Sequence, residues 1–107
     1  MALQAITDEL IAEAARRLAA AAPDAQIILF GSHARGDADE HSDLDFLVIE
    51  PEVESWGEES IRLRRQLHGL CVAADVIVVS RGYAEKWRDT RGDIVHAALG
   101  EGKVLAG

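Results

Sequence analysis

The sequence FGSHARGDADEHSDLDFLVIE, residues 30–50, places a Gly-Ser corner shortly before an Asp-x-Asp pair that runs directly into an apolar segment. A short apolar run rich in β-branched and aromatic residues, bounded by a polar loop, is typical of a β-strand. Because side chains alternate along a strand, Asp43 and Asp45 are predicted to project from one face and Leu44 from the other. The sequence therefore predicts a pair of carboxylates on one side of a strand.

Two such carboxylates repel each other and lose solvation unless a cation or a shared proton compensates. Magnesium binds oxygen ligands, often one or two carboxylates together with substrate phosphates, and two-metal sites assist displacement at phosphorus. Asp43 and Asp45 are therefore candidate metal ligands. The alternative is that Asp43 caps a turn and Asp45 lies at an exposed strand end, and the pair alone does not decide between these interpretations.

A third acid, Asp75, begins the apolar run ADVIVVS at residues 74–80. Aspartate is depleted in strands, so its place at the start of a second apolar strand calls for an explanation. Three acids converge if the two strands are neighbours. Taken by itself, Asp75 is an ordinary strand-initiating acid.

The Gly-Ser corner, Gly31 and Ser32, follows the apolar run QIILF. Gly31 permits a tight turn, and Ser32 is expected to cap a short helix that begins near His33. Helix N-termini preceded by glycine bind phosphate well. Most Gly-Ser pairs after a strand are simple turns, but beside Asp-x-Asp this pair is a candidate cradle for a triphosphate.

The remaining sequence predicts alternating helices and strands. Thr7 is a plausible N-cap for the first helix, and Gly92 is expected to break the last helical region. The pattern indicates an α/β layer with helices packed on a sheet. The predicted elements are a helix in 6–25, strands at 26–30, 43–50 and 74–80, a helix in 54–70, and one or two helices in 82–102.

Composition limits the functions that the chain can have. With 107 residues, 49% of them hydrophobic, residues 1–107 are expected to form one compact domain. The formal net charge of -8 disfavours long nucleic acid as a partner, because no basic surface is available to bind phosphates. Apolar runs far shorter than the roughly 20 residues of a membrane span predict no membrane partner. The single cysteine predicts a reducing, cytoplasmic location.

The segment from Gly31 to Ile49 resembles the signature of the DNA polymerase β-like nucleotidyltransferase superfamily, Gly-Ser-x-Ala-Arg-Gly followed by Ser-Asp-x-Asp and apolar residues. Asp75 falls where the third carboxylate of that family is expected. The small size and the ending VHAALGEGKVLAG resemble the minimal nucleotidyltransferases (MNT domains), which are often antitoxins paired with HEPN-type proteins. Ala106 is a departure, since such members usually have an aromatic residue there.

The resemblance implies an α/β (α+β) nucleotidyltransferase fold, a small mixed sheet with helices packed chiefly on one face and the acids on the open face. It implies that Asp43, Asp45 and Asp75 bind two Mg²⁺ ions, with Mn²⁺ as an alternative. Gly31 and Ser32 would hold the β- and γ-phosphates of the nucleotide. Arg35 would contact a phosphate or brace the carboxylate loop, although a plain surface arginine is the alternative.

The implied activity is that of a metal-dependent nucleotidyltransferase that transfers AMP from ATP to a hydroxyl of a protein acceptor and releases pyrophosphate. The expected partners are ATP and a HEPN-type toxin. One alternative is a non-catalytic module that neutralises a toxin by direct contact. Another, an antibiotic-modifying nucleotidyltransferase, normally needs additional structure to bind its small acceptor. The nucleobase, the acceptor and the formation of a homo-oligomer stay open.

Overall fold

The structure, a computed structural model, describes residues 6–107. Its longest helix has 14 residues. Within the described range, no helix combines the length and the apolar character needed to cross a membrane. In chain order the elements are α1 (Asp8–Ala21), β1 (Gln26–Phe30), α2 (Ser32–Arg35), β2 (Leu44–Glu50), α3 (Trp56–Arg65), β3 (Ala74–Ser80), α4 (Arg81–Trp87), α5 (Ile94–Glu101) and β4 (Lys103–Ala106).

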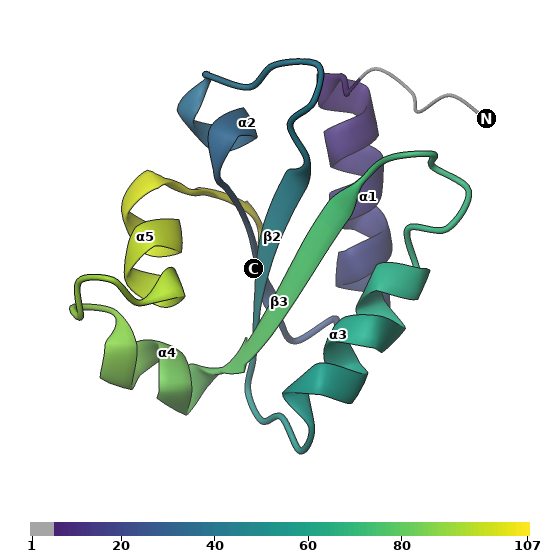
Figure 1. The fold of residues 1–107 in the computed structure, drawn as a ribbon. Helices are drawn as coiled ribbons and strands as arrows, with labels where there is room; N and C mark the ends of the chain where they lie inside the picture. Colours follow the sequence, from purple (N-terminus) through teal and green to yellow (C-terminus); the bar gives the residue numbers. More distant parts are fainter. Residues whose placement is uncertain (1–5) are drawn as a thin grey trace.

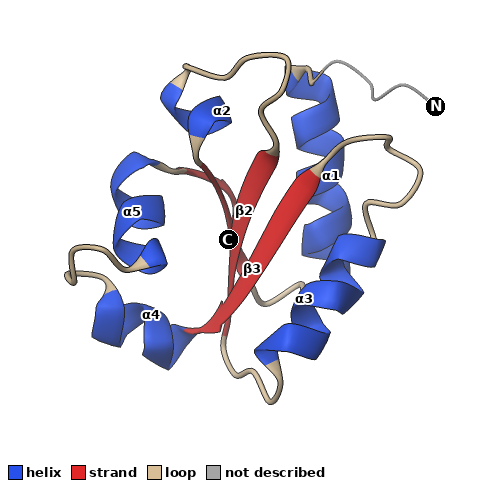
Figure 2. Ribbon diagram, in the orientation of Figure 1, coloured by secondary structure: helices blue, strands red, loops and turns tan. Residues whose placement is uncertain are grey.

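The four strands form one mixed sheet in the order β3-β2-β1-β4 (Figure 2). β1 is antiparallel to both β2 and β4, whereas β2 and β3 are parallel. Parallel neighbours need a crossover connection, and α3, which lies within the helix predicted in 54–70, provides it. The starts of β2 and β3 consequently lie at the same end of the sheet, beside α2 (Figure 1).

Alternation along the strands produces an apolar cluster on each face of the sheet. Phe46 and Val48 of β2 pack in the cluster that includes residues of α1 and α3, the two longest helices. Leu47 and Ile49 pack in the other cluster, with residues of α4 and α5. The predicted mixed sheet with packed helices is confirmed. The second face also carries helices, but these are short (Figure 1).

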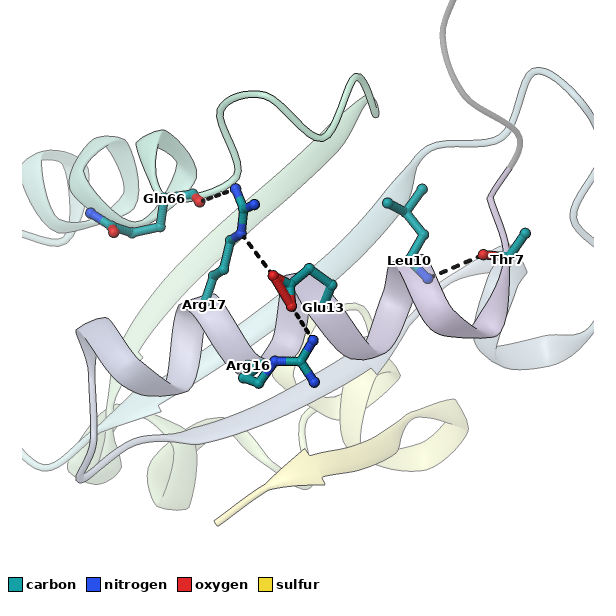
Figure 3. Close-up of polar contacts among 6 residues, drawn as sticks. All are labelled: Thr7, Leu10, Glu13, Arg16, Arg17 and Gln66. Atoms are coloured by element: carbon teal, nitrogen blue, oxygen red, sulfur yellow. Dashed lines mark hydrogen bonds and ion pairs between the residues drawn. The ribbon is translucent and has the colours of Figure 1, made fainter.

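Local sequence explains how α1 begins and how it is held. The Thr7 hydroxyl accepts a hydrogen bond from the backbone N–H of Leu10 at 3.1 Å, which confirms Thr7 as the N-cap. Farther along the helix, Arg17 pairs with Glu13 and also donates to the backbone carbonyl of Gln66 at 3.3 Å (Figure 3). Arg17 therefore links α1 to the turn that follows α3.

The C-terminal region contains two helices, where the sequence predicted one or two. It also contains a strand, β4, that the sequence did not predict. Gly92, with φ +88°, lies between α4 and α5, so the predicted break is confirmed. β4 has only four residues and pairs with β1 at the sheet edge. Its side chains are largely exposed, so β4 lacks the buried apolar run by which the other strands were recognised.

Candidate active site

The register of the parallel strands brings two of the predicted acids together. Asp45 of β2 is the direct neighbour of Asp75 of β3. Asp43 lies two residues earlier, at the end of the loop that leads into β2. Side chains at positions 43, 45 and 47 of an extended segment project to the same side, which is the face covered farther along by α4 and α5. The acids therefore lie at the same end of the sheet, where β2 and β3 begin.

The electrostatics of Asp45 reflect this crowding. The side chain is half-buried, whereas Asp43 and Asp75 are exposed. Burial raises the pKa of the Asp45 carboxyl above its usual range, and the negative charges of Asp75, Asp43 and Glu101 raise it further; His33 has the opposite effect. A carboxylate in such surroundings is stabilised by a proton or by a cation.

Gly31 leaves the room that the Asp45 carboxylate occupies. Phe30, the residue before Gly31, pairs with Asp45 across the antiparallel strands. A Cβ atom on Gly31 would lie 2.3 Å from Oδ2 of Asp45, and the φ angle of Gly31 is +78°. Both the space and the left-handed backbone therefore require glycine.

The start of α2 differs in detail from the expectation. Gly31 is the N-cap, no side chain caps the helix, and Ser32 is its first residue. The expectation that Ser32 caps α2 is therefore wrong. The reason is that the turn starts one residue earlier, since the positive φ of Gly31 reverses the chain immediately after β1.

Glu101, the last residue of α5, connects the C-terminal region to this turn. Its Oε2 atom accepts a hydrogen bond from the backbone N–H of Gly31 at 2.8 Å and one from Nη1 of Arg35 at 2.8 Å. Arg35 also donates from Nε to Asp37 at 3.2 Å. These two carboxylates raise the pKa of the Arg35 guanidinium, so Arg35 is held as a cation beside the turn.

Comparison with protein families identifies the domain that carries these residues. The family of the nucleotidyltransferase domain matches residues 9–99, which include the turn, all three acids and most of α5. The chain belongs to the nucleotidyltransferase domain family. A comparison with curated proteins found no match.

Two solved structures resemble this nucleotidyltransferase. One is a candidate nucleotidyltransferase from Sulfolobus solfataricus, with 24% identity and a TM-score of 0.60 over 90% of this chain and 76% of the other. The second is described as a toxin–antitoxin with AMP-PNP, with 23% identity and a TM-score of 0.57 over 90% of this chain and 73% of the other. At these identities the likeness shows a shared fold, and the predicted nucleotidyltransferase fold is confirmed.

The donor set of the nucleotidyltransferase fits a hard divalent cation in chemistry. Asp45 and Asp75 supply carboxylate oxygens from adjacent strands, and the charge of Asp43 acts on Asp45. In residues 6–107, however, no three His, Cys, Asp or Glu side chains are already gathered as a metal ion requires. The carboxylates would therefore have to turn toward a common ion on binding.

Sequence patterns missed two residues near the acids. Glu101 is separated from Gly31 by 70 positions, so no local spacing connects them. His33 Nε2 lies 3.3 Å from the backbone carbonyl of Ser42, which ties α2 to the loop before Asp43. A hollow of about 680 Å³ lies along that loop and is lined in part by His33, Ser42 and Asp43. Its size falls within the range of small-molecule sites.

Proposed function

We propose that this nucleotidyltransferase transfers AMP from ATP to a hydroxyl of a protein acceptor, releases pyrophosphate, and acts as the antitoxin of a pair with a HEPN-type toxin. The observation that supports the chemistry best is the direct pairing of Asp45 with Asp75 beside the Gly31 turn. In a chain of this family, that arrangement supports a metal site next to a phosphate site.

Asp43, Asp45 and Asp75 are the residues that would hold two Mg²⁺ ions, or Mn²⁺ in their place. When bound, such ions neutralise phosphate charge and lower the pKa of a hydroxyl. Asp45 is the central member of this set, because it stands between Asp43 in sequence and Asp75 in the sheet. Burial and the neighbouring carboxylates disfavour the ionised form of Asp45, so a cation would stabilise it more than it would the other two acids.

The nucleotide's phosphates are assigned to the other half of the site. Ser32, half-buried at the start of α2, offers its hydroxyl and backbone N–H to the β- and γ-phosphates. Gly31 shapes this turn. Arg35 is exposed and uses two of its N–H groups for Asp37 and Glu101, so the rest of its planar guanidinium is available for a phosphate oxygen.

In the proposed reaction, the acceptor oxygen forms a bond to the α-phosphorus of ATP while the bond from that phosphorus to the bridging oxygen breaks. The electron pair of the broken bond leaves with pyrophosphate. Asp75, exposed at the start of β3, accepts the proton of the acceptor hydroxyl. The half-buried Asp45 therefore serves as a metal ligand, whereas the exposed Asp75 takes the proton of the acceptor hydroxyl.

Two observations support the choice of partners. The structural neighbour described as a toxin–antitoxin was solved with AMP-PNP, an ATP analogue. The net charge of -8 disfavours long nucleic acid as the acceptor. A protein acceptor agrees with both observations.

The test is incubation of the protein with ATP, Mg²⁺ and a co-encoded toxin, followed by mass spectrometry of the toxin. We expect the mass of one or more AMP groups on a hydroxyl side chain, and none when the divalent ion is removed. Asp43→Asn and Asp45→Asn should abolish transfer. Asp89→Asn, a matched change at an exposed position between α4 and α5, should leave it unchanged.

Contrary results have a defined meaning. If the wild type adds no nucleotide to the toxin but suppresses its toxicity, and both Asn variants suppress it equally well, the protein is a non-catalytic binding module. Transfer that proceeds without any divalent ion would instead remove the metal from the proposal while leaving the reaction.

A further inference from the structure

The carboxylate of Glu101 joins three parts of the chain that lie far apart in sequence. One oxygen, Oε2, accepts from the backbone N–H of Gly31 and from Nη1 of Arg35, each at 2.8 Å. Gly31 precedes α2 and Arg35 ends it. A single carboxylate at the end of α5 therefore holds both ends of the short helix that carries the Gly-Ser turn.

Close packing fixes the position of Glu101. The next residue, Gly102, donates its backbone N–H to the carbonyl of Ala98 at 2.8 Å. A Cβ on Gly102 would lie 2.2 Å from that same carbonyl oxygen and 2.5 Å from Cγ2 of Ile28 in β1. The end of α5 is thus pressed against the strand that leads into Gly31. The backbone that carries Glu101 is therefore held close to the turn.

The contact also has an electrostatic cost, because it holds the negative charge of Glu101 near that of Asp45. Glu101 is one of the negative charges that raise the pKa of Asp45. Its side chain is 26% exposed, so part of its charge is held out of water beside other acids. The charge of Arg35 compensates for it.

We propose that Glu101 is a positioning residue for nucleotide binding, which fixes the Gly31 peptide and the Arg35 guanidinium where the triphosphate is received. This inference rests on the proposed function for the identity of the ligand. Glu101 itself does not touch the reacting atoms. Its effect passes through the backbone of the turn. Gly31 has a positive φ there, and no side chain caps the start of α2.

The experiment compares Glu101→Ala and Glu101→Gln in two measurements. The first is hydrogen exchange of the Gly31 amide, followed by two-dimensional NMR of isotope-labelled protein. The second is calorimetric binding of α,β-methylene-ATP with Mg²⁺, an analogue that cannot release pyrophosphate. Glu85→Ala, which removes an exposed glutamate of α4, is the matched control.

We expect the Gly31 amide to exchange faster in Glu101→Ala, and the dissociation constant for the analogue to rise roughly tenfold or more, since hydrogen bonds to a charged group are lost. Glu101→Gln retains an acceptor oxygen, so it should keep the amide protected and the affinity within about threefold of wild type. Glu85→Ala should change neither quantity.

Two outcomes would overturn the inference. One is an unchanged Gly31 amide in Glu101→Ala, even if binding falls together with the melting temperature. The other is a Glu101→Gln variant as impaired as Glu101→Ala at equal melting temperature. A wild-type protein that binds no nucleotide would overturn the proposed function instead, and the exchange of the Gly31 amide would still show whether Glu101 holds the turn.

Discussion

At the scale of single residues, Gly31 determines whether the Asp45 carboxylate can lie where it does. We predict that Gly31→Ala lowers the free energy of unfolding by about 1–3 kcal/mol, because it combines strained φ with a collision. Gly36 is a matched control, since its φ is +86° but a Cβ there meets nothing within 4 Å. Thermal unfolding should therefore show Gly31→Ala to be the more destabilised variant. Equal losses would mean that only the backbone angle matters.

The acids also show what residue patterns can predict. Alternation along a strand placed Asp43 and Asp45 on one side, and an apolar run with an acid at its start identified Asp75. The register that pairs Asp45 with Asp75 then follows from the parallel crossover. Glu101 could not be found in this way, because its contact with Gly31 depends on where α5 ends against β1, a matter of tertiary packing.

At the scale of elements, the sequence predicted the helices and strands that have a buried face and a clear boundary. α1 has a capping threonine, and the crossover helix α3 has Ser55, whose hydroxyl accepts from Glu58 N–H. β4 and the exact start of α2 were not predicted. α2 and β4 are each four residues long, so neither contains enough residues to establish a hydrophobic period. The positions of both depend on β1.

The junction of α5 with β4 offers a prediction at this scale. Gly102→Ala should destabilise the protein by roughly 2 kcal/mol or more, because the new Cβ would collide with the Ala98 carbonyl and with Ile28. Gly100, an exposed residue of α5 whose Cβ would meet nothing within 4 Å, is the control. Gly100→Ala should be neutral or stabilising by about 0.5–1 kcal/mol, since alanine favours helix. Denaturant titration of both variants measures the difference, and a stable Gly102→Ala would show that α5 is free to shift.

At the scale of the whole molecule, carboxylates are concentrated at both ends of the central strand β2. Asp45 lies near its start, and Glu50 is its last residue. Burial, followed by the hydrogen bond to Glu59, raises the pKa of Glu50 to about 7, while Arg62 and Glu50 lower the pKa of Glu59 to about 2. Glu50 is therefore largely protonated below about pH 7, beside an ionised Glu59.

This arrangement predicts how the stability of the whole protein depends on pH. A carboxyl whose pKa is raised by folding stabilises the protein fully below its unfolded pKa of about 4.5, and that contribution is lost as the pH rises through about 7. Glu59 has the opposite shift, so its contribution is lost only as the pH falls from about 4.5 toward 2. Between pH 5 and 8, therefore, stability should decrease with pH on account of Glu50. The raised pKa of Asp45 has an effect of the same sign, which begins above the unfolded pKa of that residue.

Glu50→Gln isolates the contribution of Glu50 from that of Asp45. Glutamine cannot ionise, yet its amide can still donate to Glu59, so the variant should match the wild type at pH 5 and exceed it at pH 8. The difference at pH 8 should be about 1 kcal/mol, because Glu50 is partly in water and screening reduces the full effect of the shift. Melting curves at several pH values measure it. Parallel curves for the two proteins would show that Glu50 ionises as freely in the folded chain as in the unfolded one, and would overturn the prediction.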